Sequence, residues 1–160
     1  MTYTIDIQSL GYAVDQQRLV HAITTVLDQH EIDRSSSLTV VVHDNEAQQQ
    51  LNWAHRQIDA PTDVLSFPSD PLPEAIIDEA PYLGDLLIAY PYTAKVANQR
   101  QVNLDDVLCL LVIHGTLHLL GYDHLTDEEK AEMWAAQTDA LVAVDIMPRL
   151  VDVYGGEADV

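Results

Sequence analysis

Residues 104–120 are apolar on nearly every side, and they constrain the fold more than any other segment of the chain. Asn103 can cap a helix here, and Asp105 and Asp106 would place carboxylates in its first turn, where they complement the helix dipole. A helix that is apolar all round is stable only when other elements cover it on every side. The sequence therefore predicts a central buried helix, which Gly121 ends.

Hydrophobic periodicity predicts the elements that surround this helix. In chain order we expect strand 2–8, helix 16–29, strand 38–43, a helix that begins near Asn45 and ends before Pro61, a hairpin of strands 64–67 and 83–88, and helices 91–100, 104–120 and 126–144. Leu51, Ala54 and Ile58 should turn the helix after Asn45 toward the core. This order predicts an α+β fold, with a three- to four-stranded mixed sheet packed against about five helices.

The remaining segments are expected at the surface. Residues 69–81 are rich in proline and acidic residues, which predicts a surface loop. The tail after Pro148 has no strong periodicity and should be loosely ordered. A chain of 160 residues, of which 48% are hydrophobic, lies within the usual size of one domain, so we expect residues 1–160 to fold as a single domain.

The charge of the chain limits its partners. It carries 26 acidic and seven basic residues, for a formal net charge of −19, which repels polyanions at long range. A nucleic-acid partner would need a local positive patch, a bound cation or a second protein. Cys109 is the single cysteine, the N-terminus shows no signal-peptide pattern, and no segment reaches about 18 consecutive apolar residues. We therefore expect a cytoplasmic protein that does not cross a membrane.

Three histidines at characteristic spacings predict a metal site. His114 and His118 lie four residues apart on the central helix, so both project from the same face. Gly121 allows the chain to double back and bring His124 toward the same point. Three imidazoles with an open fourth position are the catalytic pattern of zinc. The alternative is two hydrogen-bonded core histidines and an exposed third, but an apolar helix makes unpartnered imidazoles costly. We predict one Zn²⁺ ion held by this triad.

The spacing H-x-x-x-H-x-x-G-x-x-H is also that of the metzincin metalloproteases, in which a glutamate follows the first histidine. Here that position is Gly115. Glycine cannot accept a proton, so the usual general base of peptide hydrolysis is missing while the metal ligands are complete. The sequence therefore favours a metal-dependent hydrolase with a different reaction.

Three segments resemble a known family. Residues 114–124, HGTLHLLGYDH, look like the signature of the YbeY family of bacterial and organellar metal-dependent endoribonucleases. Residues 52–56, NWAHR, followed by 61–68, PTDVLSFP, are similar to its second block, and residues 83–86, LGDL, resemble its third. One departure is His55, where the family commonly has tyrosine.

The resemblance implies a zinc-type site at His114, His118 and His124, with a functional arginine at Arg56. It also implies single-stranded RNA as substrate, roles in ribosomal RNA maturation and ribosome quality control, and a ribosome or ribosomal protein as partner. We expect neither DNA nor a membrane among the partners. Two alternatives remain open: a non-catalytic ribosome-assembly factor whose metal clamps the C-terminal helices, and a metallopeptidase with an unrecognised base.

Residues near the blocks allow more than one interpretation. Arg56 could hold two phosphate oxygens with its planar guanidinium and stabilise charge as the scissile bond breaks, or it could be a surface arginine paired with a carboxylate. Trp53 and Trp134 could stack on bases, yet tryptophans on amphipathic helices are more often core residues. Asp63 and Asp85 could orient a ligand histidine or the loop near the metal, or they could be turn or strand-end residues.

Overall fold

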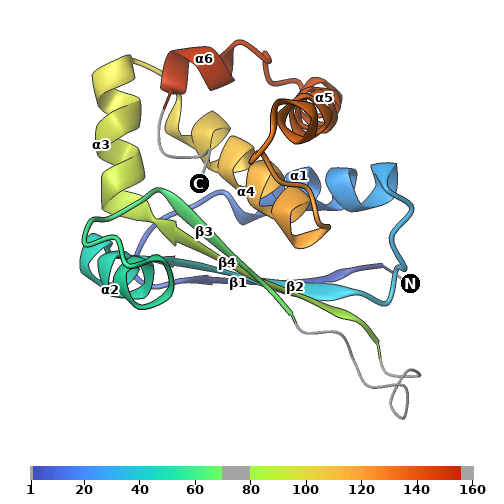
Figure 1. Ribbon diagram of the computed structural model, residues 1–160, viewed down its shortest axis with the longest axis horizontal. Coiled ribbons are helices and arrows are strands. Elements are labelled where there is room, and N and C mark those ends of the chain that lie inside the picture. The colour runs from blue at the N-terminus through green and yellow to red at the C-terminus, as the bar shows by residue number, and fades with distance from the viewer. Residues whose placement is uncertain (1, 70–79, 156–160) are drawn as a thin grey trace.

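The fold comes from a computed structural model that describes residues 2–69 and 80–155 (Figure 1). Its elements are β1 (Thr4–Ser9), α1 (Gln16–Gln29), β2 (Ser37–His43), α2 (Asn45–Arg56), β3 (Val64–Pro68), β4 (Tyr82–Ala89), α3 (Tyr90–Arg100), α4 (Leu104–Leu119), α5 (Asp127–Ala143) and α6 (Leu150–Tyr154). The predicted α+β class and its mixed sheet are confirmed. No helix in the described ranges is long and apolar enough to cross a membrane.

The four strands form one sheet in the order β1-β2-β4-β3. β1 pairs parallel to β2, and β2 pairs parallel to β4. β3 and β4 form the predicted antiparallel hairpin, in which Val64 lies opposite Ile88. The surface loop that we expected between these two strands falls largely on residues 70–79, which lie outside the described residues.

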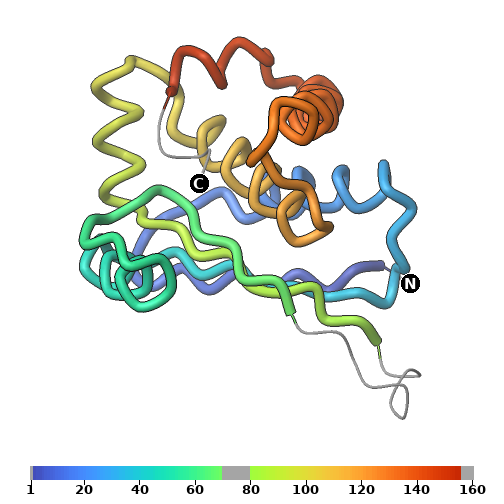
Figure 2. Tube along the Cα trace, in the orientation of Figure 1, coloured from blue at the N-terminus to red at the C-terminus, as the bar shows by residue number. Residues whose placement is uncertain are grey.

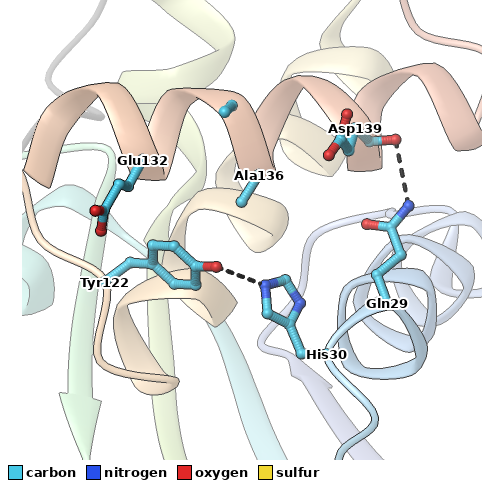
Figure 3. Close-up of a pocket in the computed structure, with 7 residues that line it drawn as sticks. Gln29, His30, Tyr122, Glu132, Ala136 and Asp139 are labelled. Atoms are coloured by element: carbon cyan, nitrogen blue, oxygen red, sulfur yellow. Dashed lines mark hydrogen bonds between the residues drawn. The ribbon is translucent and has the colours of Figure 1, made fainter.

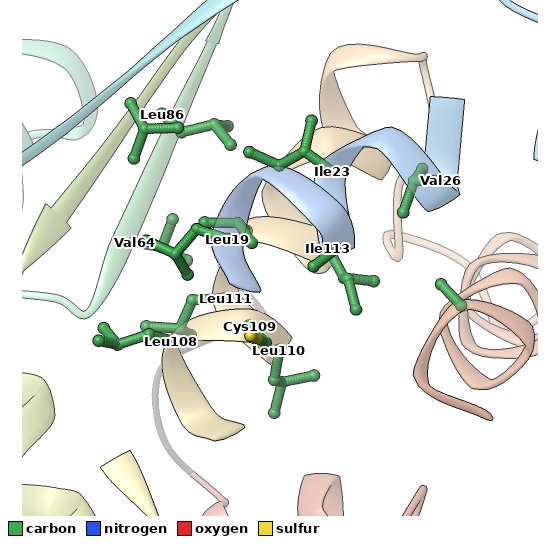
Figure 4. Packing of buried hydrophobic residues seen from close by; sticks show 14 of the residues in the cluster. Leu19, Ile23, Val26, Val64, Leu86, Leu108, Cys109, Leu110, Leu111 and Ile113 are labelled. Carbon is green, nitrogen blue, oxygen red and sulfur yellow. The ribbon is translucent and has the colours of Figure 1, made fainter. Parts of the chain in front are cut away.

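Helix α4 is the centre of the fold, as its apolar sequence predicts. It lies between the sheet and α5, with α1 beside it on the same face of the sheet (Figures 1 and 2). Every α4 residue from 107 to 117 is buried. Figure 4 shows Ile113 of α4 near Ile23 of α1, and Leu86 of β4 and Val64 of β3 on the sheet side. Burial on all sides explains why this helix needs no polar face.

Helix α2 buries a polar face, and the apolar face predicted for it is wrong. Leu51 is half-buried, Ala54 is exposed and Ile58 is 41% exposed, whereas the buried residues of the helix are Gln48 and Asn52. The periodicity of a few apolar residues could not show which neighbours the helix would meet.

Main-chain carbonyls explain the polar face of α2. The Gln48 Nε2 donates to the carbonyl oxygen of Leu87 at 2.7 Å, and the Asn52 Nδ2 donates to that of Ala60 at 2.8 Å. A buried carbonyl without a partner is costly, so amide side chains suit these positions better than leucine would. The face is therefore selected by hydrogen bonding, which apolar spacing does not reveal.

The C-terminal segment is ordered into α6, so the predicted loose tail is wrong as far as residue 155. Tyr154 is only 1% exposed, and its hydroxyl donates to Asp63 Oδ2 at 2.9 Å. Asp63 is fully buried at the start of β3, where its Oδ1 accepts from the Val64 N–H at 2.8 Å. Burial, followed by the nearby Asp63 charge, raises the pKa of Tyr154. The Tyr154 hydroxyl thus fixes the tail, because it donates a hydrogen bond to the buried Asp63 carboxylate.

This contact makes a stability prediction. Tyr154→Phe removes the hydroxyl and leaves the Asp63 carboxylate with one donor fewer, which should lower the free energy of unfolding by about 1–3 kcal/mol. Chemical denaturation at pH 7 measures the change. Tyr90→Phe is the matched control, because the Tyr90 hydroxyl donates to an exposed carbonyl of Ala13, and its effect should stay within about 0.5 kcal/mol. Equal losses in the two variants would contradict the role given to Tyr154.

Candidate metal centre

The structure brings the three predicted ligands together. His114 and His118 lie one turn apart on α4, and His124 lies in the loop that joins α4 to α5. Gly121 adopts a left-handed conformation, with φ +102°, where the chain doubles back. One ring nitrogen of each histidine lies within 4.8 Å of the others, a grouping that could hold a metal ion. The two Nε2 atoms of His114 and His118 are 3.1 Å apart, close to the roughly 3.3 Å that tetrahedral zinc–imidazole geometry requires.

Hydrogen bonds fix the tautomers of two imidazoles. His118 Nδ1 donates to the carbonyl oxygen of Tyr122 at 2.9 Å, and His114 Nδ1 donates to Gln137 Oε1 at 2.9 Å. With both protons on Nδ1, two Nε2 lone pairs face each other. The His124 Nε2 is buried and has no hydrogen-bond partner in the described structure. A cation among the three nitrogens would remove the repulsion and satisfy the orphaned atom, so these residues fit a metal.

The electrostatics of the site also favour neutral ligands. Burial, and second the neighbouring His118, lowers the pKa of His114 from 6.5 to about 3. Burial is also the main cause that lowers the pKa of His118. Both imidazoles are therefore uncharged at pH 7, and a metal ion does not have to displace protons from them.

Trp134 of α5 forms a wall of the site. Its ring centroid lies 5.9 Å from that of His114 and 5.8 Å from that of His124, in both cases edge to face. The ammonium of Lys130 lies 5.3 Å from the centre of the Trp134 ring. The half-buried indole thus packs on two candidate ligands. This position is neither the fully buried core position nor the exposed base-stacking position that the sequence left open.

Close packing explains the glycine at position 115. A Cβ there would lie 2.7 Å from Leu86 Cδ2 and 3.2 Å from Ser66 Oγ, and Leu86 is itself fully buried. Position 115 therefore faces the sheet and has no room for a carboxylate. The general base of the metzincin type is absent by residue identity, and the packing of Leu86 and Ser66 opposes a side chain in its place.

Gln137 is the functional residue that sequence reasoning missed. It lies on the buried stripe of α5, between Met133 and Ala140, and is 2% exposed. Its amide oxygen accepts from His114 Nδ1 and so fixes the direction of the Nε2 lone pair. An uncharged polar residue at a core position of an amphipathic helix is the signal that could have identified it.

Gln137→Leu should weaken metal affinity by about 10- to 100-fold, because the acceptor that orients His114 is lost. Competition with a chromophoric chelator measures the affinity. Gln137→Glu keeps an acceptor oxygen and should retain most of it. If the leucine variant binds metal as tightly as the native chain, Gln137 does not position the ligand.

The loop that carries His124 is also tied to α1. The Tyr122 hydroxyl donates to His30 Nε2 at 2.9 Å, while His30 Nδ1 donates to the Val26 carbonyl at 2.8 Å. Figure 3 shows this contact inside an open pocket of about 750 Å³, lined by residues of α1, the loop and α5. The Tyr122 carbonyl, which holds His118, is therefore anchored to the end of α1.

The structure places Arg56 outside the histidine triad. It is the last residue of α2 and is exposed, and within residues 2–69 and 80–155 it has neither a hydrogen bond nor an ion pair. The alternative of a surface arginine paired with a carboxylate thus has no support there. Strand β3 contacts both the end of α2 and α4. The His55 ring of α2 lies 4.7 Å from the Phe67 ring of β3. The neighbouring Ser66 Oγ donates to the Gly115 carbonyl of α4 at 3.4 Å.

The carboxylates in the three segments that resemble the family have structural partners. Asp63 accepts from the Tyr154 hydroxyl, and Asp85 accepts from the Tyr82 hydroxyl. Asp123 accepts from the backbone N–H of His124 at 2.8 Å, which fixes the loop. These contacts agree with the turn and strand roles that the sequence allowed for Asp63 and Asp85.

Comparison with known proteins gives consistent matches. The family model described as Endoribonuclease YbeY matches residues 5–145. The Endoribonuclease YbeY of Streptomyces griseus is 41% identical over 134 residues, which cover 79% of this chain and 81% of that protein. Its counterpart in Cellvibrio japonicus is 35% identical over 142 residues, with 87% and 78% covered. The solution structure of TM1509 from Thermotoga maritima superposes with a TM-score of 0.58 at 27% identity, covering 86% of this chain and 88% of that one.

Proposed function

The chain belongs to the YbeY endoribonuclease family, and from this premise we propose that it is a metal-dependent, single-strand-specific endoribonuclease that acts in ribosomal RNA maturation and ribosome quality control. One observation carries the metal-dependent chemistry. The Nε2 lone pairs of His114 and His118 face each other, and the buried, unpartnered His124 Nε2 lies beside them. We assign His114, His118 and His124 as the ligands.

Zinc is the ion that this donor set suits best. Three imidazole nitrogens with an open fourth position are the usual catalytic zinc site, whereas magnesium and calcium prefer oxygen ligands. When bound, the ion would supply Lewis-acid catalysis, by polarising a phosphoryl oxygen and activating a nucleophile near neutral pH. Burial keeps the imidazoles of His114 and His118 neutral, and Gln137 and the Tyr122 carbonyl orient them before the ion arrives.

Arg56 is the proposed catalytic residue. Its exposed guanidinium can donate two parallel hydrogen bonds to phosphate oxygens and stabilise the charge that develops when the phosphodiester bond breaks. A cation that has no carboxylate partner among the described residues is free to do so. In a chain with a net charge of −19, such a cation matters for binding a polyanion.

The same net charge favours assisted substrate capture. A surface with 26 acidic residues does not attract RNA at long range, so we propose that the enzyme acts with a ribosome or ribosomal protein in the cytoplasm. The partner would position ribosomal RNA at the site, and the histidines and Arg56 would act on it locally.

The proposed activity is tested with purified protein that has been stripped of metal and reloaded with zinc. Internal cleavage of a single-stranded RNA should appear with zinc and disappear with a chelator, while the same RNA annealed to its complement and single-stranded DNA remain intact. Failure of the fully loaded protein to cleave any RNA would favour the non-catalytic assembly factor. Chelator-sensitive cleavage of unfolded casein would favour the peptidase instead.

A further inference from the structure

Trp53 is exposed, contrary to the core position that tryptophans on amphipathic helices usually take. It lies on α2 and its exposed fraction is 57%. An indole has a large apolar surface, and leaving it in water forgoes the stabilisation that burial would give. Among the described residues, no aromatic ring stacks on it. The fold therefore does not account for tryptophan at this position.

The neighbourhood of Trp53 suits an anionic ligand with flat rings. Trp53 and Arg56 are three residues apart on one helix, so their side chains project from the same face about one turn apart. Helical side chains lean toward the N-terminus, so the Arg56 side chain, at the end of the helix, is directed back toward the turn that carries Trp53. No acidic residue occurs between Glu46 and Asp59, although the chain has 26 of them. An unpaired cation and an exposed aromatic ring thus lie one turn apart on α2, and the nearby Asp59 carboxylate accepts a hydrogen bond from Gln49 at 2.7 Å.

We propose that Trp53 is a base-stacking residue for single-stranded RNA: its indole stacks on an unpaired base while Arg56 binds the phosphate of an adjoining nucleotide. Base stacking on aromatic side chains, combined with a cation for the backbone, is how proteins bind single strands without reading sequence. This inference rests on the proposed function and adds the part of the site that contacts a base.

The arrangement also provides a cause for single-strand specificity. In a duplex each base is already stacked on both faces and paired at its edge, so it can reach Trp53 only after it is unstacked and unpaired. An unpaired base has a face available without that cost. A phosphate contact alone does not make this distinction, because both forms of RNA present phosphates.

Trp53→Ala should raise the Kd for a single-stranded oligoribonucleotide, and the KM of cleavage, by about 5- to 150-fold. The kcat should change by no more than about twofold, since the indole does not touch the reacting atoms. Trp53→Phe retains an aromatic face and should recover most of the affinity. Trp53→Leu is apolar without such a face and should recover little. Met147→Ala removes another exposed apolar side chain, 60% exposed, and should have no effect.

An oligonucleotide with abasic sites provides the sharper comparison. Moving one abasic site along the strand should locate a position at which the native chain and Trp53→Ala bind equally, because the stacked base is missing. If native protein cleaves RNA and Trp53→Ala binds it unchanged, the stacking inference is wrong while the proposed function stands. If Trp53→Leu binds as well as native protein, the contact needs only an apolar side chain, and the stacking inference is again wrong.

A native chain that neither binds nor cleaves RNA overturns the proposed function itself. Loss of ribosome binding in Trp53→Ala with unchanged RNA affinity assigns the surface to a protein partner and overturns the stacking role.

Discussion

His118→Ala is expected to remove both the bound metal and the cleavage of RNA. The variant loses one of the three proposed ligand nitrogens, so the metal content of protein dialysed at pH 8 should fall from about one ion per chain to near zero. Lewis-acid stabilisation of the transition state is worth several kcal/mol, so kcat/KM should fall on the order of 10³-fold or more. Elemental analysis and a single-strand cleavage assay on the same preparation measure both losses.

His21→Ala is the matched control, because His21 is exposed on α1 and is not one of the three clustered histidines. It should keep full metal content and activity. A second readout separates lost binding from misfolding: saturating zinc should raise the Tm of native protein, in line with about 2.7 kcal/mol at 100 times Kd, and leave that of His118→Ala unchanged. A variant that still holds one ion per chain would show that the triad is not the metal site.

Arg56→Ala should lower kcat by about 10²- to 10³-fold, the usual effect of removing one group that stabilises developing charge. Metal content should remain at one ion per chain, because Arg56 lies outside the triad. Arg56→Lys keeps the charge but loses the planar fork that matches two phosphate oxygens, so it should recover only part of the rate. Single-turnover kinetics on single-stranded RNA measure the chemical step.

Arg149→Ala is the control for net charge. Arg149 is exposed and lies just before α6, and its loss changes the charge of the chain by the same one unit as the loss of Arg56. Arg149→Ala should therefore show any long-range electrostatic effect without the local contact. An Arg56→Ala enzyme as fast as the Arg149→Ala enzyme would remove the catalytic assignment.

The predictions from sequence succeeded where a local pattern determines the structure. The apolar residues of α4 leave it no solvent-facing side, and the β3–β4 hairpin follows from two strand patterns that are close in sequence. The histidine cluster is also local, because His114 and His118 share a helix face and Gly121 turns the chain back to His124. These features depend on residues within one segment or on two strands that the chain connects directly.

The predictions failed where the burial of a residue depends on a partner that is distant in sequence. Asp63 and Tyr154 are 91 residues apart, so nothing near Tyr154 in sequence indicates that it will be buried. The polar face of α2 depends on the Leu87 carbonyl, 39 residues from Gln48. The hydrogen bond between Gln137 and His114 joins α5 to α4. In each case a buried polar group selects its partner through hydrogen bonding, and the periodicity of apolar residues carries no information about that choice.

The tight contact at Gly115 adds a second obstacle to peptidase chemistry, beyond the missing glutamate. A glutamate at position 115 would press its Cβ against the side chains of Leu86 and Ser66. Conversion between the two chemistries would therefore also require smaller or repositioned side chains at Leu86 and Ser66. The residue that follows the first histidine is thus coupled to two side chains of the sheet, and directed evolution that varies only the residues around the ion would leave that constraint in place.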